Sequence, residues 1–253
     1  GGAGNVARNV VSGGGLCTLI SVVGDDKEQK VLKKLIRETK NLKAELIFSD
    51  RKTSLKQRYI SGQQQILRVD NESTKDIGQN CEKRVIEVFK KHIKRTDLVI
   101  LSDYDKGVLT QRLLKKIILL SKKYNKTTIV DPKKSSFSVY SGSDIITPNL
   151  NELLKENNSN LFKHTSEEGL IRKISEELIK QYKFSSIITT RSSNGMTIVS
   201  RNNKSHNLSS KALEVYDVSG AGDTVVAYLS LSLASGMNIE ESAKIANRAA
   251  GIS

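Results

Sequence analysis

The segment at residues 215–224, Val-Tyr-Asp-Val-Ser-Gly-Ala-Gly-Asp-Thr, constrains the fold of this chain more than any other stretch. Gly220 and Gly222 permit tight backbone geometry and the close approach of a ligand. The apolar run that follows at residues 225–234 predicts a buried helix. A glycine-rich turn that opens a helix presents free N–H groups and the positive end of the helix dipole. We therefore expect an anion to bind at this turn.

Asp223 lies in the first turn of the expected helix. A carboxylate beside an anion site is unusual for binding alone, but it suits the removal of a proton from a hydroxyl that attacks phosphorus. The alternative is a simple helix-start carboxylate, because Gly-x-Gly turns are common before helices. A dinucleotide-binding interpretation of Gly220 and Gly222 is weaker, since the next suitable acidic residue, Glu240, falls in a helical pattern.

The length of 253 residues suits one large α/β domain, and the net charge is +14. Lysine pairs fall on helical patterns beside apolar residues, so we interpret them as solvated helix faces rather than a nucleic-acid surface. These pairs are Lys33-Lys34, Lys90-Lys91, Lys115-Lys116 and Lys122-Lys123. Cys17 and Cys81 are far apart in apolar patterns, which indicates reduced, buried thiols. Three scattered histidines give no metal-ligand spacing, and no apolar run is long enough to span a membrane.

Strands alternate with helices along the chain, which predicts a mostly parallel sheet covered on both faces. The strands are expected at residues 16–23, 44–48, 55–60, 65–69, 98–101, 127–130, 145–147, 186–190 and 196–200. The helices are expected at residues 26–40, 81–94, 110–124, 166–182 and 225–234, with a further helical pattern in the first ten residues.

Two other stretches carry candidate binding residues. The chain opens on Gly1 and Gly2, and Asn5 offers both donors and an acceptor to sugar hydroxyls. A dinucleotide motif is the alternative there, but it needs a preceding strand. Strands 55–60 and 65–69 flank a hairpin turn and carry Lys56, Arg58 and Arg68. These cations either protect an exposed edge or bind a phosphate.

Polar residues follow several expected strands, at the edge where ligands bind in open α/β sheets. They include Asp103 and Lys106 after one strand, Asp131-Pro132-Lys133 after the next, and Asn149-Leu150-Asn151-Glu152 and Thr190-Arg191 further on.

The late motif resembles the Asp-x-x-Gly-Ala-Gly-Asp signature of the ribokinase family of carbohydrate kinases. Here it consists of Asp217, Gly220, Ala221, Gly222 and Asp223. The opening Gly-Gly-Ala-x-Asn-Val-Ala resembles the first signature of the same family. Within it, the hairpin and the segments Ser102-Asp103-Tyr104-x-Lys106-Gly107, Asp131-Pro132-Lys133 and Thr147-Pro148-Asn149 look like the heptose 7-phosphate kinase branch, found alone or joined to a nucleotidyltransferase. Asp105 departs from this pattern, because the family usually has a small residue there.

The resemblance covers nearly the whole chain and implies a ribokinase-like three-layer α/β/α fold with a mostly parallel central sheet and a small β lid. We expect one kinase domain over residues 1–253, incomplete at both ends, with the lid strands within residues 44–70. The implied reaction is ATP-dependent phosphorylation of the anomeric hydroxyl of D-glycero-D-manno-heptose 7-phosphate, in ADP-heptose and lipopolysaccharide core biosynthesis.

The resemblance also implies roles for particular residues. Asp223 would accept the proton, and the N–H groups of Gly220, Ala221 and Gly222 would hold the transferring phosphoryl group. ATP would contact Asn149, Leu150, Asn151, Glu152, Thr190, Arg191, Gly195 and Asn247, with Glu152 near Mg²⁺. The sugar phosphate would contact Gly1, Gly2, Asn5, Lys56, Arg58, Arg68, Asp103 and Lys106.

Two alternatives stay open: a ribokinase-family kinase for another sugar or nucleoside, and an inactive kinase fragment or basic binding module. For the full-length parent we expect a cytoplasmic homodimer, joined through the hairpin strands, that binds neither nucleic acid nor membrane.

Overall fold

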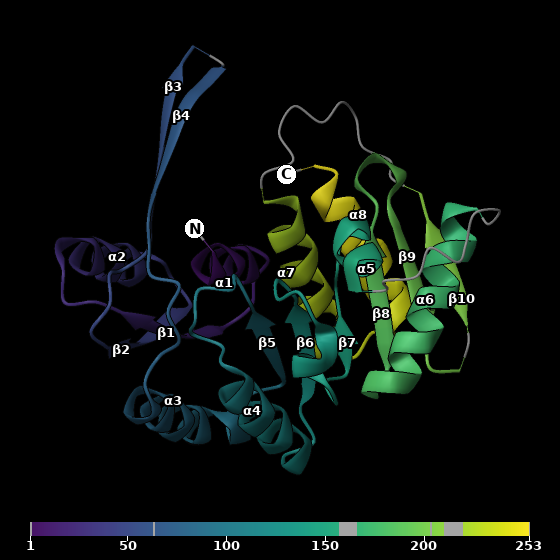
Figure 1. Ribbon diagram of the computed structural model, residues 1–253, viewed down its shortest axis with the longest axis horizontal. Helices are drawn as coiled ribbons and strands as arrows, with labels where there is room; N and C mark the ends of the chain where they lie inside the picture. The colour runs from purple at the N-terminus through teal and green to yellow at the C-terminus, as the bar shows by residue number, and fades with distance from the viewer. Residues whose placement is uncertain (1, 63, 157–165, 203, 210–219, 253) are drawn as a thin grey trace.

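The computed structural model describes residues 2–62, 64–156, 166–202, 204–209 and 220–252 (Figure 1). Its helices are α1 (Ala3–Ser12), α2 (Lys27–Glu38), α3 (Gln79–His92), α4 (Gln111–Lys123), α5 (Leu150–Glu156), α6 (Glu167–Tyr182), α7 (Ala221–Ala234) and α8 (Ile239–Ala250). Its strands are β1 (Cys17–Val23), β2 (Leu42–Phe48), β3 (Leu55–Ser61), β4 (Gln64–Asn71), β5 (Leu98–Ser102), β6 (Thr127–Asp131), β7 (Ile145–Ile146), β8 (Ser186–Thr190), β9 (Met196–Ser200) and β10 (Ser205–Leu208). Short 3₁₀ turns lie at Ile93–Arg95, Phe137–Tyr140 and Ser192–Asn194.

Most of the longer helices begin at a polar cap, because a side-chain oxygen satisfies an N–H group that has no partner within the helix. Asp26 accepts a hydrogen bond from the N–H of Gln29, and Thr110 accepts one from Leu113. Helix α7 differs, since it begins after Gly220 in a left-handed conformation with φ of 100° and no described side chain caps it. Its first-turn N–H groups therefore stay available for a ligand.

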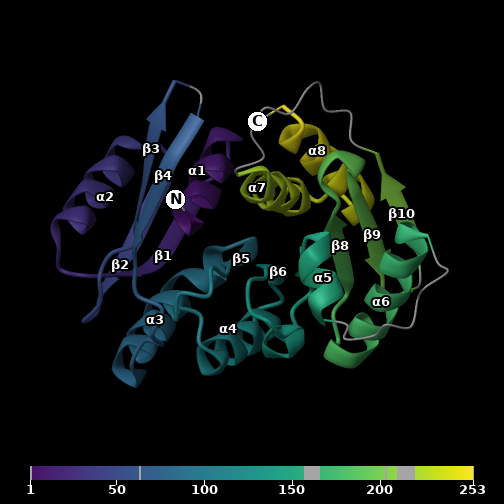
Figure 2. The same cartoon turned by 45° about the horizontal axis from the view of Figure 1, so that its top comes forward.

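The larger sheet has the strand order β10-β9-β8-β7-β6-β5. Strands β5 to β8 run parallel, and β9 and β10 add antiparallel pairs at one edge. Successive side chains of a strand point to opposite faces. On β6, Val130 packs into the core shared with α4 and α6, whereas Ile129 packs with α7 and α8 on the other side (Figure 2). This arrangement confirms the expected α/β fold with a mostly parallel central sheet.

Strands β1 and β2 form a separate parallel pair, and helices cover both of its faces as well. Ala7 of α1 and Ile36 of α2 cluster with Leu19 of β1 on one face. Val22 and Ile47 join the core of α3 and α4 on the other. In the described part of the chain, β1 and β5 do not pair with each other, and a cavity lies between them. The alternation of strands and helices predicted one parallel sheet. In the structure, β1 and β2 form one sheet and β5 to β10 form another.

Strands β3 and β4 form an antiparallel hairpin that extends away from the body of the molecule (Figure 1). Tyr59 pairs with Leu67, and Val69 lies next to them along β4, so these three side chains share one apolar face. All three are more than one third exposed. The opposite face carries the charged residues, because Arg58 pairs with Arg68 and Lys56 with Asp70. The hairpin predicted from the sequence is confirmed, and its two faces have different chemistry.

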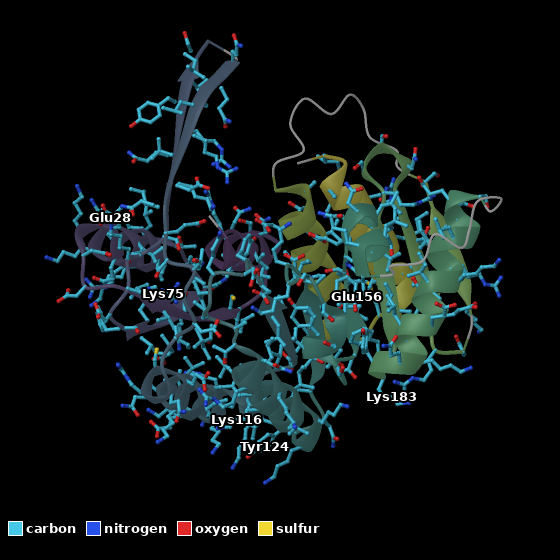
Figure 3. The ribbon with its side chains drawn as sticks, in the orientation of Figure 1. Glu28, Lys75, Lys116, Tyr124, Glu156 and Lys183 are labelled. Atoms are coloured by element: carbon cyan, nitrogen blue, oxygen red, sulfur yellow. The ribbon has the colours of Figure 1, made fainter. Side chains whose placement is uncertain are left out.

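The structure also bears on the predictions made from composition. The paired lysines lie on exposed helix positions, as Lys116 does on the outer side of α4 (Figure 3). Cys17 and Cys81 are free thiols. Cys81 is buried as predicted, whereas Cys17, at the start of β1, is only partly buried, so the prediction is wrong for that residue. Within the described ranges, no helix has the length and apolar character needed to cross a bilayer. Strand β10 is absent from the sequence prediction, since its four residues, Ser-His-Asn-Leu, show little β-branched or aromatic character.

Candidate active site

A cavity of about 2230 Å³ runs from the carboxyl ends of β5 and β6 to the start of α7 and the base of the hairpin. It brings together thirteen of the residues expected from the sequence: Gly2, Asn5, Lys56, Arg58, Arg68, Asp103, Lys106, Asn149, Glu152, Thr190, Gly220, Gly222 and Asp223. Among the other expected residues, Leu150, Asn151, Arg191, Gly195, Ala221 and Asn247 do not line it. Gly1 and Asp217 lie outside the described residues.

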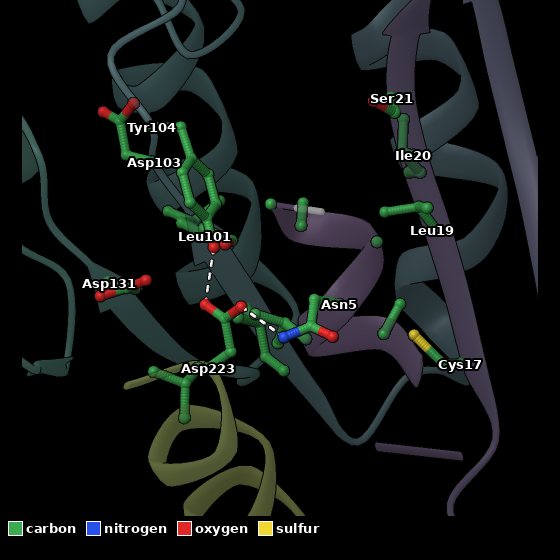
Figure 4. Close-up of a pocket in the computed structure, with 18 of the residues that line it drawn as sticks. Asn5, Cys17, Leu19, Ile20, Ser21, Leu101, Asp103, Tyr104, Asp131 and Asp223 are labelled. Atoms are coloured by element: carbon green, nitrogen blue, oxygen red, sulfur yellow. Dashed lines mark hydrogen bonds between the residues drawn. The ribbon is translucent and has the colours of Figure 1, made fainter. Parts of the chain in front are cut away.

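Asp223 lies at the centre of this site, and both of its carboxylate oxygens accept hydrogen bonds (Figure 4). The Tyr104 hydroxyl donates to Oδ1 over 2.6 Å, and the Asn5 side-chain amide donates to Oδ2 over 2.7 Å. Residue 5 comes from α1 and residue 104 from the loop after β5, so two distant segments converge on the start of α7. The carboxylate is thereby held at the mouth of a helix whose first N–H groups are free to bind an anion.

The ring of Tyr104 lies against Gly2, which has a left-handed backbone with φ of 59°. A Cβ atom on Gly2 would come within 3.5 Å of the ring. Such a distance is an ordinary contact, so the positive φ, and not the ring, is what favours glycine at this position. Burial first, and then the hydrogen bond to Asp223, raise the pKa of Tyr104, so its hydroxyl stays protonated and donates at neutral pH.

Residues 103–107, which follow β5 and contain Tyr104, are tied to the segment that follows the hairpin. The Arg51 guanidinium donates to the carbonyl oxygens of Ser73 and Lys106 over 2.7 and 2.6 Å. The Ile77 N–H donates to the Gly107 carbonyl over 2.8 Å. A Cβ on Gly107 would overlap the Lys75 carbonyl, so the two backbones touch there.

Two further carboxyl groups lie near Asp223. Burial, followed by the charges of Asp223 and Glu152, raises the pKa of Asp131 to about 8. Asp103 is buried and accepts a hydrogen bond from the Tyr140 hydroxyl over 2.7 Å. Burial also raises the pKa of Asp103, although the Tyr140 hydrogen bond opposes that shift.

Glu152 and Asn149 form a reciprocal pair at the start of α5. The Asn149 N–H donates to Glu152 Oε2, and the Glu152 N–H donates to Asn149 Oδ1, each over 2.9 Å. Lys133 approaches Glu152 Oε1 to 2.8 Å, and this hydrogen bond raises the pKa of Lys133. Glu152 and Lys133 therefore present a carboxylate and an ammonium group to the cavity. A carboxylate can bind Mg²⁺, and a cation can bind phosphate.

The other residues expected around the nucleotide have structural partners. The Arg191 guanidinium is buried and contacts Glu168 at 3.1 Å and the Asn194 carbonyl at 3.0 Å. The Asn247 amide donates to the Ser209 carbonyl over 2.9 Å. Gly195 has φ of 83° and shapes the turn before β9.

Most of the cations on the charged face of the hairpin are paired. Lys56 contacts Asp70 at 3.1 Å and Glu72 at 3.2 Å, and Arg68 contacts Asp70 at 2.6 Å. Lys106 reaches across to Glu72. Hydrogen bonds from Arg68 and Lys56 hold the pKa of Asp70 well below its usual range. Arg58 has no ion-pair partner among the described residues, and it lines the cavity.

Three cavity residues, Tyr104, Asp131 and Lys133, are missing from the sequence-based site. Tyr104 and Lys133 follow β5 and β6, and Asp131 is the last residue of β6. All three therefore lie at the edge where the sequence predicted polar residues, although none was given a role in the site. The sequence gives no indication that Tyr104 reaches Asp223, because this contact joins residues 119 positions apart.

The family model described as pfkB family carbohydrate kinase matches residues 1–253. The chain is 37% identical over 253 residues to the bifunctional protein HldE of Paramagnetospirillum magneticum and 40% identical over 256 residues to that of Aliarcobacter butzleri. Each match covers 100% of this chain, but 51% and 52% of the relatives. The chain therefore spans about half the length of these curated relatives.

Solved structures share the fold. Phosphofructokinase-2 from Escherichia coli in complex with potassium superposes with a TM-score of 0.83 at 21% identity, covering 99% of this chain and 80% of that one. Ribokinase from Giardia lamblia gives a TM-score of 0.78 at 19% identity, covering 98% and 82%. At such identities the likeness shows a common fold.

Proposed function

The chain belongs to the pfkB family of carbohydrate kinases, and from this premise we propose that its acceptor is the anomeric hydroxyl of D-glycero-D-manno-heptose 7-phosphate. ATP is the phosphoryl donor in this proposal, and the product is the 1,7-bisphosphate. The resemblance of the sequence motifs to the heptose 7-phosphate kinase branch supports this choice of acceptor, together with the cationic hairpin beside the cavity.

The observation that carries the proposal is the position of Asp223 at the uncapped start of α7, inside a cavity shared with Glu152 and Arg58. Asp223 takes the proton of the anomeric hydroxyl as its oxygen attacks the γ-phosphorus. A bond forms between that oxygen and phosphorus, the bond from phosphorus to the β,γ-bridging oxygen breaks, and ADP leaves. The N–H groups of Gly220, Ala221 and Gly222 stabilise the charge on the transferring group.

The donor set on the other side of the cavity fits a magnesium–nucleotide complex. Glu152 offers a hard carboxylate ligand, and Mg²⁺ commonly combines one or two carboxylates with water and phosphate oxygens. When bound, Mg²⁺ neutralises phosphate charge. Lys133 lies within contact of Glu152 and supplies a cation for the same phosphates. We assign the nucleotide phosphates to Asn149, Glu152 and Thr190, which line the cavity, and the rest of the nucleotide to Leu150, Asn151, Arg191, Gly195 and Asn247, which do not line it.

The charged hairpin face is the proposed site for the 7-phosphate. The two carboxylates there, Asp70 and Glu72, form ion pairs with Lys56, Arg68 and Lys106. Arg58 adds a fourth cation, so the cluster has excess positive charge. Because Arg58 is unpaired among the described residues, its fork of donors can bind phosphate without breaking an ion pair. Gly1, Gly2, Asn5 and Asp103 are assigned to the sugar itself.

The test is a panel of acceptors with radiolabelled ATP and Mg²⁺: heptose 7-phosphate, unphosphorylated heptose, fructose 6-phosphate, ribose and adenosine. We expect the highest kcat/KM for heptose 7-phosphate and a loss of at least tenfold without its phosphate. A preference for an unphosphorylated sugar or nucleoside would contradict the acceptor assignment. Absence of transfer to every acceptor would favour a non-catalytic role.

We further propose that the full-length parent is a homodimer that acts in the cytoplasm, in ADP-heptose biosynthesis for the lipopolysaccharide core. The apolar hairpin face of Tyr59, Leu67 and Val69 is the proposed contact with the second copy. An exposed edge with unpaired backbone groups and apolar side chains is usually covered in the working assembly.

A further inference from the structure

Tyr104 occupies a position that the proposed reaction does not yet explain. Its hydroxyl and the Asn5 amide bind different oxygens of the same carboxylate, Oδ1 and Oδ2 of Asp223. The two donors approach from different segments, the loop after β5 and helix α1 (Figure 4). One donor alone would let the carboxylate turn about its terminal torsion, which is broad for aspartate. Two donors on separate oxygens fix its plane.

We propose that Tyr104 is a positioning residue for phosphoryl transfer, which holds the Asp223 carboxylate in the orientation that accepts the proton of the sugar hydroxyl. This inference rests on the proposed function. An ionised carboxylate has about four acceptor sites, so the two hydrogen bonds from Tyr104 and Asn5 leave others open to the substrate. The Tyr104 ring lies beside Gly2, the residue that precedes α1.

The first test is Tyr104→Phe, which keeps the ring on Gly2 and removes the donor. We expect kcat to fall about tenfold, with KM for ATP unchanged. Tyr182→Phe is the matched control, because the Tyr182 hydroxyl donates to Glu156 over 2.7 Å and neither residue lines the cavity. Its kcat should equal that of the parent. A Tyr104→Phe variant whose kcat also matches the parent would overturn the proposal.

A second readout does not need activity. The chain has seven tyrosines, and labelling with [ζ-¹³C]tyrosine gives each a resonance that is sensitive to its hydrogen bond. At neutral pH, Asp223→Ala should move the Tyr104 resonance and leave that of Tyr182 in place. If no acceptor in the panel is phosphorylated but the Tyr104 resonance moves, the proposed function is wrong, whereas the hydrogen bond between Tyr104 and Asp223 is confirmed. If the Tyr104 resonance does not move, the positioning role is wrong whatever the activity.

Discussion

At the scale of single residues, the chemistry of the site depends on how carboxylates are held and charged. Asp223 combines a central position in the cavity with two side-chain donors and the free N–H groups of a helix start. A purely structural carboxylate there would contribute typically 0.3–1 kcal/mol through the helix dipole. A base would matter far more to the rate than to stability, and substitutions can separate the two roles.

Asp223→Asn should lower kcat by about 10²–10⁴-fold, because asparagine retains size and polarity but cannot take the proton. KM for ATP should stay within a few-fold of the parent value. The matched control is Asp105→Asn, since Asp105 is an exposed carboxylate paired with Lys134 outside the cavity. Steady-state kinetics with the full-length parent kinase measure both variants. If Asp223→Asn retains kcat within a few-fold, Asp223 is not the base.

Arg58→Ala should raise KM for the sugar phosphate about ten- to a hundredfold, because a charge-assisted hydrogen bond contributes roughly 1.5–3 kcal/mol. KM for ATP should hardly change. Arg172→Ala provides the comparison, as Arg172 pairs with Glu176 on the exposed side of α6. Equal increases in both Michaelis constants would remove Arg58 from the phosphate site.

Asp131 gives a prediction for stability against pH. Its pKa is raised to about 8, well above the value of about 3.9 in an unfolded chain. The folded state therefore keeps this proton over a pH range in which the unfolded state has lost it. The contribution of Asp131 to the free energy of unfolding falls as pH rises from about 4 to about 8, and then levels off. Asp131→Asn stays neutral, so its thermal midpoint should fall less between pH 5 and pH 8, measured in metal-free buffer. Parallel declines in the two proteins would contradict the raised pKa.

Sequence reasoning located the residues whose position in the fold depends on a local motif. Asp223 was predictable because glycine spacing and helix polarity act within one turn, and thirteen of the expected residues line one cavity. Tyr104 and Asp131 were not assigned, because their importance depends on packing between distant segments. Similarly, the side-chain partners of Arg191 appear only once α6 is packed beside β8.

At the scale of elements, the hairpin is the part of the molecule whose two faces serve different purposes. Alternation along β3 and β4 predicted the strands, and their register separates Tyr59, Leu67 and Val69 from the cations. The register is a property of the two strands together, so the pattern of one strand does not determine it. A shift by one residue would place different residues on each face. The bulge between Tyr59 and Ile60 is a further detail that the sequence pattern does not indicate.

Substitution of the apolar face should separate the proposed homodimer. The double variant Tyr59→Ser, Leu67→Ser removes a cross-strand pair that is exposed in the single chain, so it should weaken association without loss of the fold. Light scattering at micromolar concentration measures the mass of the full-length parent and of the variant. Gln64→Ser, at the exposed tip of the same hairpin, should leave the mass unchanged. A monomeric parent would contradict the dimer.

At the scale of the whole molecule, the alternation of strands and helices predicted the layers correctly. The helices cover both faces of the larger sheet, and the same order of layers continues over β1 and β2. The division into two sheets was not predictable from local patterns. Periodicity reports which face of a strand is buried, but it does not report which strand pairs with which.

The contacts that tie the hairpin base to the loop of Tyr104 have a consequence for regulation. Arg51 binds both segments, and the Gly107 backbone touches the segment that leaves the hairpin. A shift of the hairpin on binding phosphate or a second copy would therefore be transmitted to the donor on Asp223. Coupling between two binding events is reciprocal. In a dimer joined through this hairpin, the apparent affinity for the sugar phosphate would depend on protein concentration, and saturation with the sugar phosphate would in turn change the dimer dissociation constant.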